Sequence, residues 1–220
     1  MQEAEVSFSS RGGGPTRLDG VLHTPEGSGS PRPATVLCHP HSLHGGSMQV
    51  PVIEATAREL VERGMVALRF DFRGVGRSGG SFGEGLGEVE DVAGAIEFLA
   101  QRDEVDESRV YLMGYSFGAS VGLRCVEEGC PVSALAALCL PVGDSTILPL
   151  DEQFWLNWAK PKLFLAGDRD HICPLSELRS IVDRLPEPKQ LQVLEGADHF
   201  LWGREREVAV CVADYLEGLA

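Results

Sequence analysis

The chain has 220 residues, of which 43% are hydrophobic and 24% are charged, and its formal net charge is −14. This length and composition are typical of a globular protein with one large domain or two small ones. The acidic charge argues against nucleic acid and anionic membranes as partners, because both are themselves negatively charged.

No segment approaches the roughly 20 consecutive apolar residues that a transmembrane helix needs. The first ten residues, MQEAEVSFSS, are acidic and lack the basic start and apolar core of a signal peptide. We therefore expect a cytoplasmic protein. The six cysteines are scattered without C-x-x-C spacing, so most of them are expected to be free thiols in the interior.

Segments with strand and helix patterns alternate along the chain. Two early strands are expected at residues 5–10 and 18–25, with a Gly-rich turn at 11–15 between them. The continuous apolar run at 34–39 is typical of a strand buried on both faces. Five helices are expected at 52–64, 87–102, 117–129, 174–186 and 204–220, and five further strands at 65–72, 109–115, 133–141, 161–167 and 189–196.

This alternation predicts an α/β fold. Strands joined by helices of about a dozen residues form right-handed crossovers, which place the strands parallel in one sheet. The first two strands are expected to form an antiparallel hairpin at the edge, giving a mostly parallel, twisted sheet of eight strands with helices on both faces. The chain has neither repeats nor a linker, so a single domain is expected to cover residues 1–220.

The stretch GYSFG is the strongest chemical signal in the sequence. A predicted strand ends at Tyr115 and a predicted helix begins at Phe117, so Ser116 lies in the turn between them. Gly114 and Gly118 allow close packing of the backbone there, since a Cβ would clash. Such a turn lifts the serine hydroxyl above the sheet edge and aims the N–H of Phe117 at the same point, where it can stabilise an oxyanion. A helix N-cap is the alternative role for this serine.

A serine hydroxyl needs a base to take its proton and a carboxylate to orient that base. Downstream of Ser116, Asp168 and Asp170 follow the predicted strand at 161–167, and His199 follows the last predicted strand. These residues lie where strands end, at the edge where open α/β sheets bind ligands. The order serine, acid, histidine is that of hydrolases built on a strand–turn–helix nucleophile.

The chain resembles the serine hydrolases of the α/β-hydrolase superfamily, in particular small lidless bacterial enzymes related to the dienelactone-hydrolase-like branch. The matching stretches are CHPHSLHGGSM, LRFDFRGVGRSGGSFGEGLGEVEDV, GYSFG, GDRDHICP and GADHF, which together extend from about residue 34 to residue 200. The resemblance implies a triad of Ser116 as nucleophile, Asp170 as acid and His199 as base.

Asp170 is preferred to Asp168 because the family pattern, G-x-x-D followed closely by proline, matches Gly167, Asp170 and Pro174. Asp168 is expected to form or cap a turn. The true dienelactone hydrolases carry a cysteine where this chain has Ser116, so dienelactone activity is not expected.

Only residues 142–160 separate two of the predicted strands, at the place where many members of the superfamily insert a cap domain. This segment has room for one short helix, so we expect an open site without a cap. Small soluble esters are therefore favoured as substrates over long-chain lipids.

Three of the six histidines, His39, His41 and His44, occur in the stretch LCHPHSLHGGS. In the resembled fold, the loop after this strand supplies the second oxyanion donor through a backbone N–H. The N–H of His41 is the expected donor. The N–H groups of Ser42 and Leu43, its neighbours in the loop, remain alternatives. The histidines are not spaced i, i+4 on a helix and no nearby ligand pair completes a set, so no metal site is expected.

The expected function is that of a carboxylesterase that cleaves small or short-acyl esters through an acyl-enzyme, without cofactor or metal. An amidase, peptidase or thioesterase on the same triad remains open, while an intact triad argues against a non-catalytic binding protein. A metal-dependent hydrolase is a further alternative. The natural substrate and the oligomeric state, monomer or homodimer, stay undetermined. The substrate is expected to contact His39, Leu43, Tyr115, Trp155 and Phe200, with ordinary packing as an equal interpretation for the last two.

Overall fold

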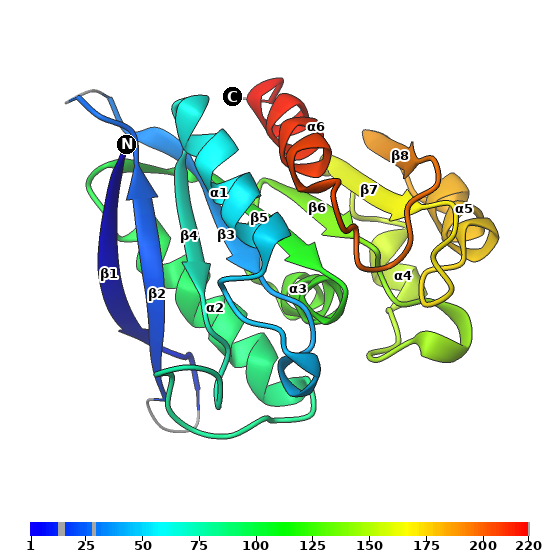
Figure 1. Cartoon of the computed structure of the whole chain (residues 1–220), viewed down its shortest axis with the longest axis horizontal. Coiled ribbons are helices and arrows are strands. Elements are labelled where there is room, and N and C mark those ends of the chain that lie inside the picture. Colours follow the sequence, from blue (N-terminus) through cyan, green and yellow to red (C-terminus); the bar gives the residue numbers. More distant parts are fainter. Residues whose placement is uncertain (13–15, 28–29, 220) are drawn as a thin grey trace.

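The computed structural model describes residues 1–12, 16–27 and 30–219 (Figure 1). Residues 13–15 of the expected Gly-rich turn, and Ala220 at the end of the last expected helix, lie outside this description. The described residues form eight strands and six α-helices. In chain order these elements are β1 (Gln2–Ser9), β2 (Arg17–Thr24), β3 (Arg32–Cys38), α1 (Pro51–Glu62), β4 (Val66–Phe70), α2 (Leu86–Ala100), β5 (Val105–Tyr115), α3 (Phe117–Glu127), β6 (Ala134–Leu138), α4 (Glu152–Trp155), β7 (Lys162–Gly167), α5 (Leu175–Arg184), β8 (Lys189–Leu194) and α6 (Glu205–Glu217).

The strands form one sheet in the order β1-β2-β4-β3-β5-β6-β7-β8. The β1–β2 and β2–β4 pairs are antiparallel, and every other neighbouring pair is parallel. This confirms the expected mostly parallel sheet with antiparallel first strands. Strand β5 begins at Val105, four residues before its predicted start, and Val105 pairs with Arg32 of β3. The prediction began later because the polar stretch DESR after Val105 is typical of a loop.

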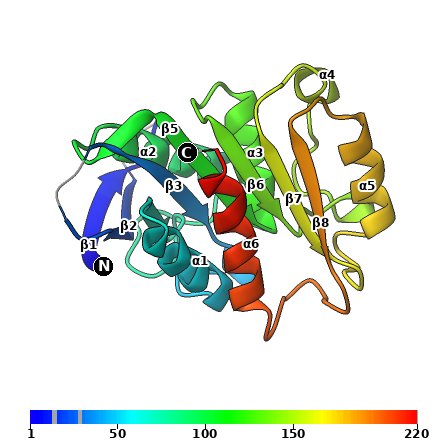
Figure 2. The same cartoon turned by 90° about the horizontal axis from the view of Figure 1, so that it is seen from above.

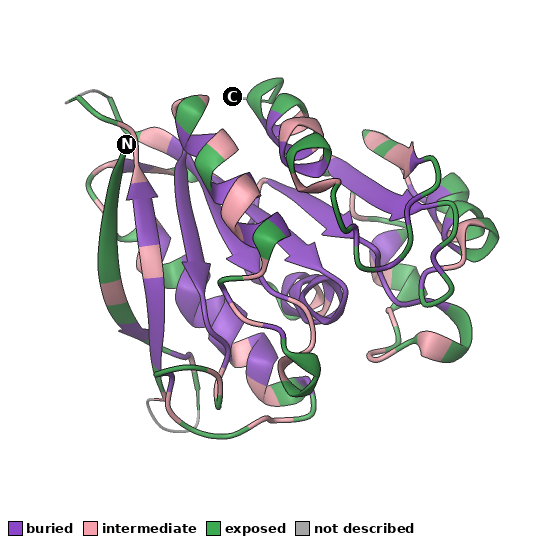
Figure 3. Ribbon diagram, viewed as in Figure 1, coloured by how far each residue is buried: buried purple, intermediate pink, exposed green. Residues whose placement is uncertain are grey.

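Helices cover both faces of the sheet. Helices α1 and α6 pack together on one face and α2 and α3 on the other, while α5 packs against β7 and β8 (Figure 2). Every residue of β4, β6 and β7 is buried, and Figure 3 shows the central strands in the colour of buried residues. Burial on both faces explains why these strands appear in the sequence as continuous apolar runs. No helix of the described chain combines the length and the apolar character needed to cross a membrane.

The connection between β6 and β7 is short. It holds a 3₁₀ turn, Gly143–Ser145, and the four-residue helix α4. All of its residues are described, and they leave the carboxyl edge of the sheet without a cap domain, as expected.

A disulfide joins Cys125 and Cys130, and the other four cysteines are free. Helix α3 ends at Glu127 and the chain reverses at Gly129, where φ is 90°, which brings the two Cα atoms within 5.6 Å. The prediction that most cysteines are free thiols is therefore confirmed for four of the six. Cys125 and Cys130 form a disulfide because the chain reverses after α3, and their spacing matches no known motif.

Two buried histidines connect strands of the sheet to their neighbours. The Nε2 of His23 on β2 accepts a hydrogen bond from Nε of Arg69 on β4 at 2.9 Å. The Nε2 of His39, after β3, accepts one from the N–H of Phe72 at 3.1 Å. Burial lowers the pKa of each imidazole to about 4, and in His23 the nearby Arg69 adds to the effect. Both histidines are therefore neutral at pH 7.

We expect the free energy of unfolding to decrease as the pH falls from about 6.5 towards 4. In the unfolded chain a histidine takes up its proton near pH 6.5, whereas His23 and His39 in the folded chain resist protonation until about pH 4. The unfolded state thus binds more protons in this window, at about 1.4 kcal/mol per pH unit for each histidine. Urea unfolding at several pH values measures the slope. The variant His23→Gln, which keeps an acceptor for Arg69, should show a shallower slope, and an unchanged slope would contradict the assignment.

Candidate active site

Ser116 lies in a strained turn between β5 and α3. Its φ is 55° and its ψ is −115°, an uncommon conformation for a residue other than glycine. Such a conformation costs about 1–3 kcal/mol and persists only where the surroundings hold it. Here the N–H of Ser116 donates to the carbonyl of Leu138 on β6 at 2.8 Å, and its own carbonyl accepts from Ala119 and Ser120 in α3. The neighbouring strand and helix therefore fix the serine at the carboxyl edge of the sheet.

Gly114 and Gly118 allow α3 to approach two strands closely. A Cβ on Gly114 would overlap the carbonyl of Gly118, and a Cβ on Gly118 would overlap the carbonyls of Cys38 and His39 at the end of β3. Only glycine fits both positions without a backbone shift. The result is that the loop after β3 lies against the N-terminus of α3.

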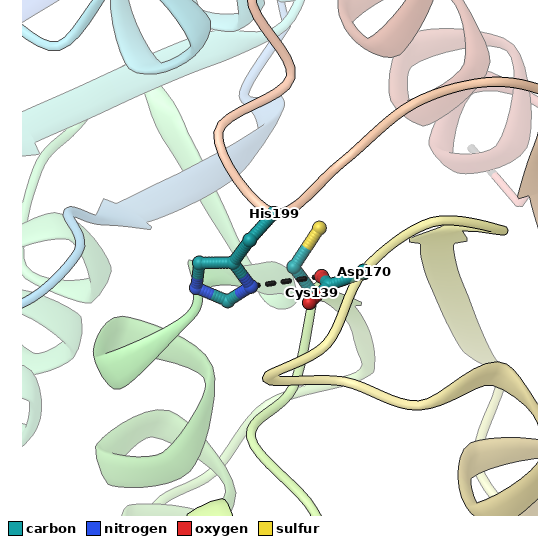
Figure 4. Close-up of side chains that lie close together, drawn as sticks. All are labelled: Cys139, Asp170 and His199. Carbon is teal, nitrogen blue, oxygen red and sulfur yellow. Dashed lines mark hydrogen bonds and ion pairs between the residues drawn. The ribbon is translucent and has the colours of Figure 1, made fainter.

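The structure brings together the three side chains that the sequence singles out. Asp170 follows β7 and His199 follows β8, and both reach Ser116. The Nε2 of His199 is 2.8 Å from Oγ of Ser116, and its Nδ1 is 2.8 Å from Oδ2 of Asp170, the dashed contact in Figure 4. A carboxylate only accepts hydrogen bonds, so Nδ1 carries the imidazole proton and Nε2 accepts from the serine hydroxyl. We call this arrangement the Ser116–His199–Asp170 row.

The environment of Asp170 keeps its carboxyl ionised. Oδ1 accepts the N–H groups of Ile172 and Cys173, each at 2.8 Å. Burial favours the neutral acid, but the hydrogen bonds from His199 and from these two N–H groups outweigh it and lower the pKa of Asp170. Asp168 instead accepts the N–H of Gly196 at 2.7 Å, a contact between two loops.

Tyr115 holds the backbone of the histidine loop. Its hydroxyl donates to the carbonyl of His199 at 2.7 Å, and the side chain is buried. Burial raises the pKa of this phenol, so it stays protonated and remains a donor. The residue before Ser116 thereby helps to place the imidazole.

Cys139 adds a third potential metal ligand to Asp170 and His199. It follows β6 with φ of 47°, and one ligand atom from each residue lies within 4.8 Å of the others (Figure 4). Cysteine, histidine and aspartate are common ligands of zinc. Burial raises the pKa of the Cys139 thiol well above its usual range, and Nδ1 of His199 is already bonded to Asp170. A metal would have to deprotonate this thiol and displace that hydrogen bond, so the donors fit the hydrogen-bonded row better than a metal centre.

Some N–H groups of the loop after β3 and of the start of α3 are free in the described chain. The rings of His41 and Phe117 are 4.8 Å apart, which places the loop after β3 beside the start of α3. In this loop the N–H of Leu43 donates to Nδ1 of His41 at 3.2 Å, and the N–H of His44 donates to the carbonyl of His41 at 2.9 Å. Within the described chain, the N–H groups of His41, Ser42 and Phe117 have no protein acceptor.

A cavity of about 880 Å³ opens over Ser116 and His199. Two of the residues expected to contact substrate, Tyr115 and Phe200, line it. Several aliphatic wall residues were not predicted from the sequence. Among these are Val50, Pro51, Ile147 and Ile172. Val50 and Pro51 come shortly after the stretch CHPHSLHGGSM, and Ile172 lies within GDRDHICP, so these motifs were the available signal. No motif lies near Ile147.

The other three expected contacts lie elsewhere. The buried His39 donates from Nδ1 to its neighbour's carbonyl and accepts at Nε2, so its ring faces inward. Leu43 is 66% exposed and is not part of the cavity wall. Trp155 is buried, donates its indole N–H to Glu127 and lines a separate cavity of about 240 Å³. Trp155 is therefore a packed interior residue and does not line the cavity over Ser116.

The chain belongs to the alpha/beta hydrolase domain family, and residues 33–211 match the model of this family. It is 32% identical over 189 residues to an uncharacterized protein from Rickettsia prowazekii, covering 84% of this chain and 78% of that protein. An alpha-beta serine hydrolase homologue from Coxiella burnetii is 29% identical with a TM-score of 0.78, covering 100% and 97% of the two chains. An α/β serine hydrolase without lid from Xanthomonas campestris is 28% identical with a TM-score of 0.76, covering 99% and 93%. These likenesses confirm the expected resemblance and fold, and they support a hydrolase.

We expect Gly118→Ala to destabilise the fold by more than about 3 kcal/mol, because its Cβ would collide with two carbonyl groups of the backbone. Gly122→Ala is the matched control in the same helix, since the nearest atoms to its Cβ would be side-chain carbons of Leu112, the first at 3.2 Å. Urea unfolding of both variants measures the difference. Equal stabilities would show that the close approach of α3 to β3 does not constrain the site.

Proposed function

We propose that the protein is a carboxylesterase-type serine hydrolase that cleaves small or short-acyl esters through an acyl-enzyme. The observation that carries this proposal is the Ser116–His199–Asp170 row, with both hydrogen bonds at 2.8 Å on the wall of an open cavity. Membership of the alpha/beta hydrolase family supports the same class of chemistry.

In the proposed mechanism, Ser116 Oγ attacks the ester carbonyl carbon while Nε2 of His199 takes its proton. The ionised Asp170 stabilises the resulting imidazolium and keeps Nδ1 as the donor. When the tetrahedral intermediate collapses, the alcohol leaves with the proton from His199 and the acyl group stays on the serine. A water molecule activated by His199 then attacks the acyl-enzyme, which releases the acid and restores Ser116.

The negative charge on the tetrahedral intermediate needs donors that are already in position. We assign this role to the N–H of Phe117, at the positive end of the α3 dipole, and to the N–H of His41 on the facing loop. The lack of other acceptors for these groups in the described chain supports the assignment. Ser42, whose N–H is similarly free, is the alternative on the loop side.

The shape of the site favours small substrates. The cavity is open, its volume is about 880 Å³, and the short connection between β6 and β7 leaves it uncapped. A long acyl chain would extend into water, which removes the gain from apolar burial. Of the substrate contacts predicted from the sequence, Tyr115 and Phe200 line this cavity.

Ser116→Ala should lower kcat for p-nitrophenyl butyrate by at least about 10⁴-fold, because no other group in the row can form the acyl-enzyme. A fluorophosphonate probe should label the native protein at Ser116 and leave the variant unlabelled. The proposal fails if the native protein neither turns over nor reacts, or if the variant does both equally well.

Separate substitution of Asp168 and Asp170 tests which of the two orients the histidine. Asp170→Asn should reduce kcat/KM by about 10³–10⁴-fold, because an amide no longer stabilises the imidazolium. Asp168→Asn keeps an acceptor for Gly196 and should stay within a few-fold of the native enzyme. Steady-state kinetics with p-nitrophenyl butyrate compares them, and the opposite order would assign the acid to Asp168.

A further inference from the structure

The cavity over Ser116 has an unbalanced charge. Among the described residues that line it, Glu205 is the sole acidic side chain, and neither lysine nor arginine is present. Its wall does contain His41 and His44, but burial and the neighbouring His44 lower the pKa of His41 and favour its neutral form. The formal net charge of the whole chain is −14, so Glu205 adds local negative charge to an acidic protein.

The carboxylate of Glu205 forms no ion pair within the described chain. It is the first residue of α6, half-buried, and its Oε1 accepts only the N–H of Gly203 at 3.0 Å. The adjacent cation, Arg204, is bonded to Glu207 at 2.6 Å and to the carbonyl of Glu195 at 2.9 Å. No ion pair to Glu205 forms within the described chain, so the carboxylate is neutralised by no cation of the protein.

Two aromatic side chains stand on the same wall. Phe200 is 59% exposed and Trp202 is 71% exposed, although both line the cavity together with Glu205. Aromatic faces attract organic cations through the negative charge of their π systems, and a nearby carboxylate adds to this attraction. The carboxylate of Glu205, in the first turn of α6, lines the same cavity as these two rings.

We propose that the cavity selects esters that carry an ammonium group, and that Glu205 determines this specificity together with Phe200 and Trp202. The inference rests on the proposed ester hydrolysis and adds the charge of the substrate. In the proposed complex the ester carbonyl is at Ser116 and the cationic group is bound at the part of the same cavity that Glu205, Phe200 and Trp202 line. Esters with a carboxylate or sulfonate group meet repulsion at the same place and should be poor substrates.

The test compares cationic esters with neutral esters of the same shape. Butyrylcholine is paired with 3,3-dimethylbutyl butyrate for the alcohol part, and the p-nitrophenyl ester of 4-(trimethylammonio)butyrate with that of 5,5-dimethylhexanoate for the acyl part. In at least one pair, the ratio of kcat/KM, cationic over neutral, should fall about five- to tenfold in Glu205→Gln relative to the native enzyme. Because the quantity is a ratio, a general loss of activity in the variant does not affect it.

Two controls separate this local effect from the charge of the whole surface. Glu62→Gln removes an exposed carboxylate of α1 that lies outside the cavity wall and, in the described chain, pairs with no cation, so the ratio should not change. Raising NaCl from about 0.02 M to about 0.5 M should lower the ratio in the native enzyme and have less effect in Glu205→Gln, because salt screens exposed charges.

The outcomes distinguish the two proposals. If p-nitrophenyl butyrate is not hydrolysed at all, the proposed function fails. If it is hydrolysed while both ratios are the same in the native enzyme and in Glu205→Gln, or the cationic esters are not cleaved, the selection of cations is overturned and the esterase proposal stands.

Discussion

Gly114 and Gly118 let the backbone of α3 touch the ends of β5 and β3, where any side chain would overlap a carbonyl group. This contact turns the chain sharply enough to hold Ser116 at a φ of 55°. It also brings the start of α3 beside the loop that carries His41. The serine hydroxyl, the helix N-terminus and the loop N–H groups are therefore positioned by one constraint, and a shift of α3 would move all three relative to one another.

The parallel sheet supplies the rest of the geometry. Gly167 at the end of β7 pairs with Leu194 at the end of β8, so the loops that carry Asp170 and His199 begin side by side. Strand β6 separates β5 from β7, and Cys139 at its end fills the space beside Asp170. The parallel arrangement explains why residues far apart in the sequence meet within hydrogen-bond distance at one edge.

The sequence predicted those parts of the molecule that depend on local patterns. Buried parallel strands appear as apolar runs, and the turn at Ser116 requires glycines at fixed positions around it. Asp170 and His199 could be placed because each follows such a strand closely. The positions of side chains in irregular loops depend instead on distant partners. His39 faces inward because its Nε2 meets the N–H of Phe72, and Trp155 is held below the surface by Glu127, contacts that no spacing in the sequence indicates.

The three clustered histidines illustrate the same limit. His39 is buried and neutral, whereas the ring of His41 packs against those of His44 and Phe117. Their closeness in sequence does not make them one site, because their rings have different surroundings, and the N–H groups of His41 and Ser42 have no acceptor within the described chain. In the proposed mechanism the main chain of this loop thus contributes more than its imidazoles do.

The two carboxylates of the site act at different depths. Asp170 is 4% exposed and bonded to three donors, so water hardly screens its effect on His199. Glu205 is half-buried on the cavity wall and bonded to a single N–H, so its field acts mainly on those parts of a substrate that lie away from the ester group. In the two proposals, proton transfer depends on Asp170 and the charge of the bound substrate on Glu205, so the preference for a substrate charge could change at the start of α6 without altering the chemistry at Ser116.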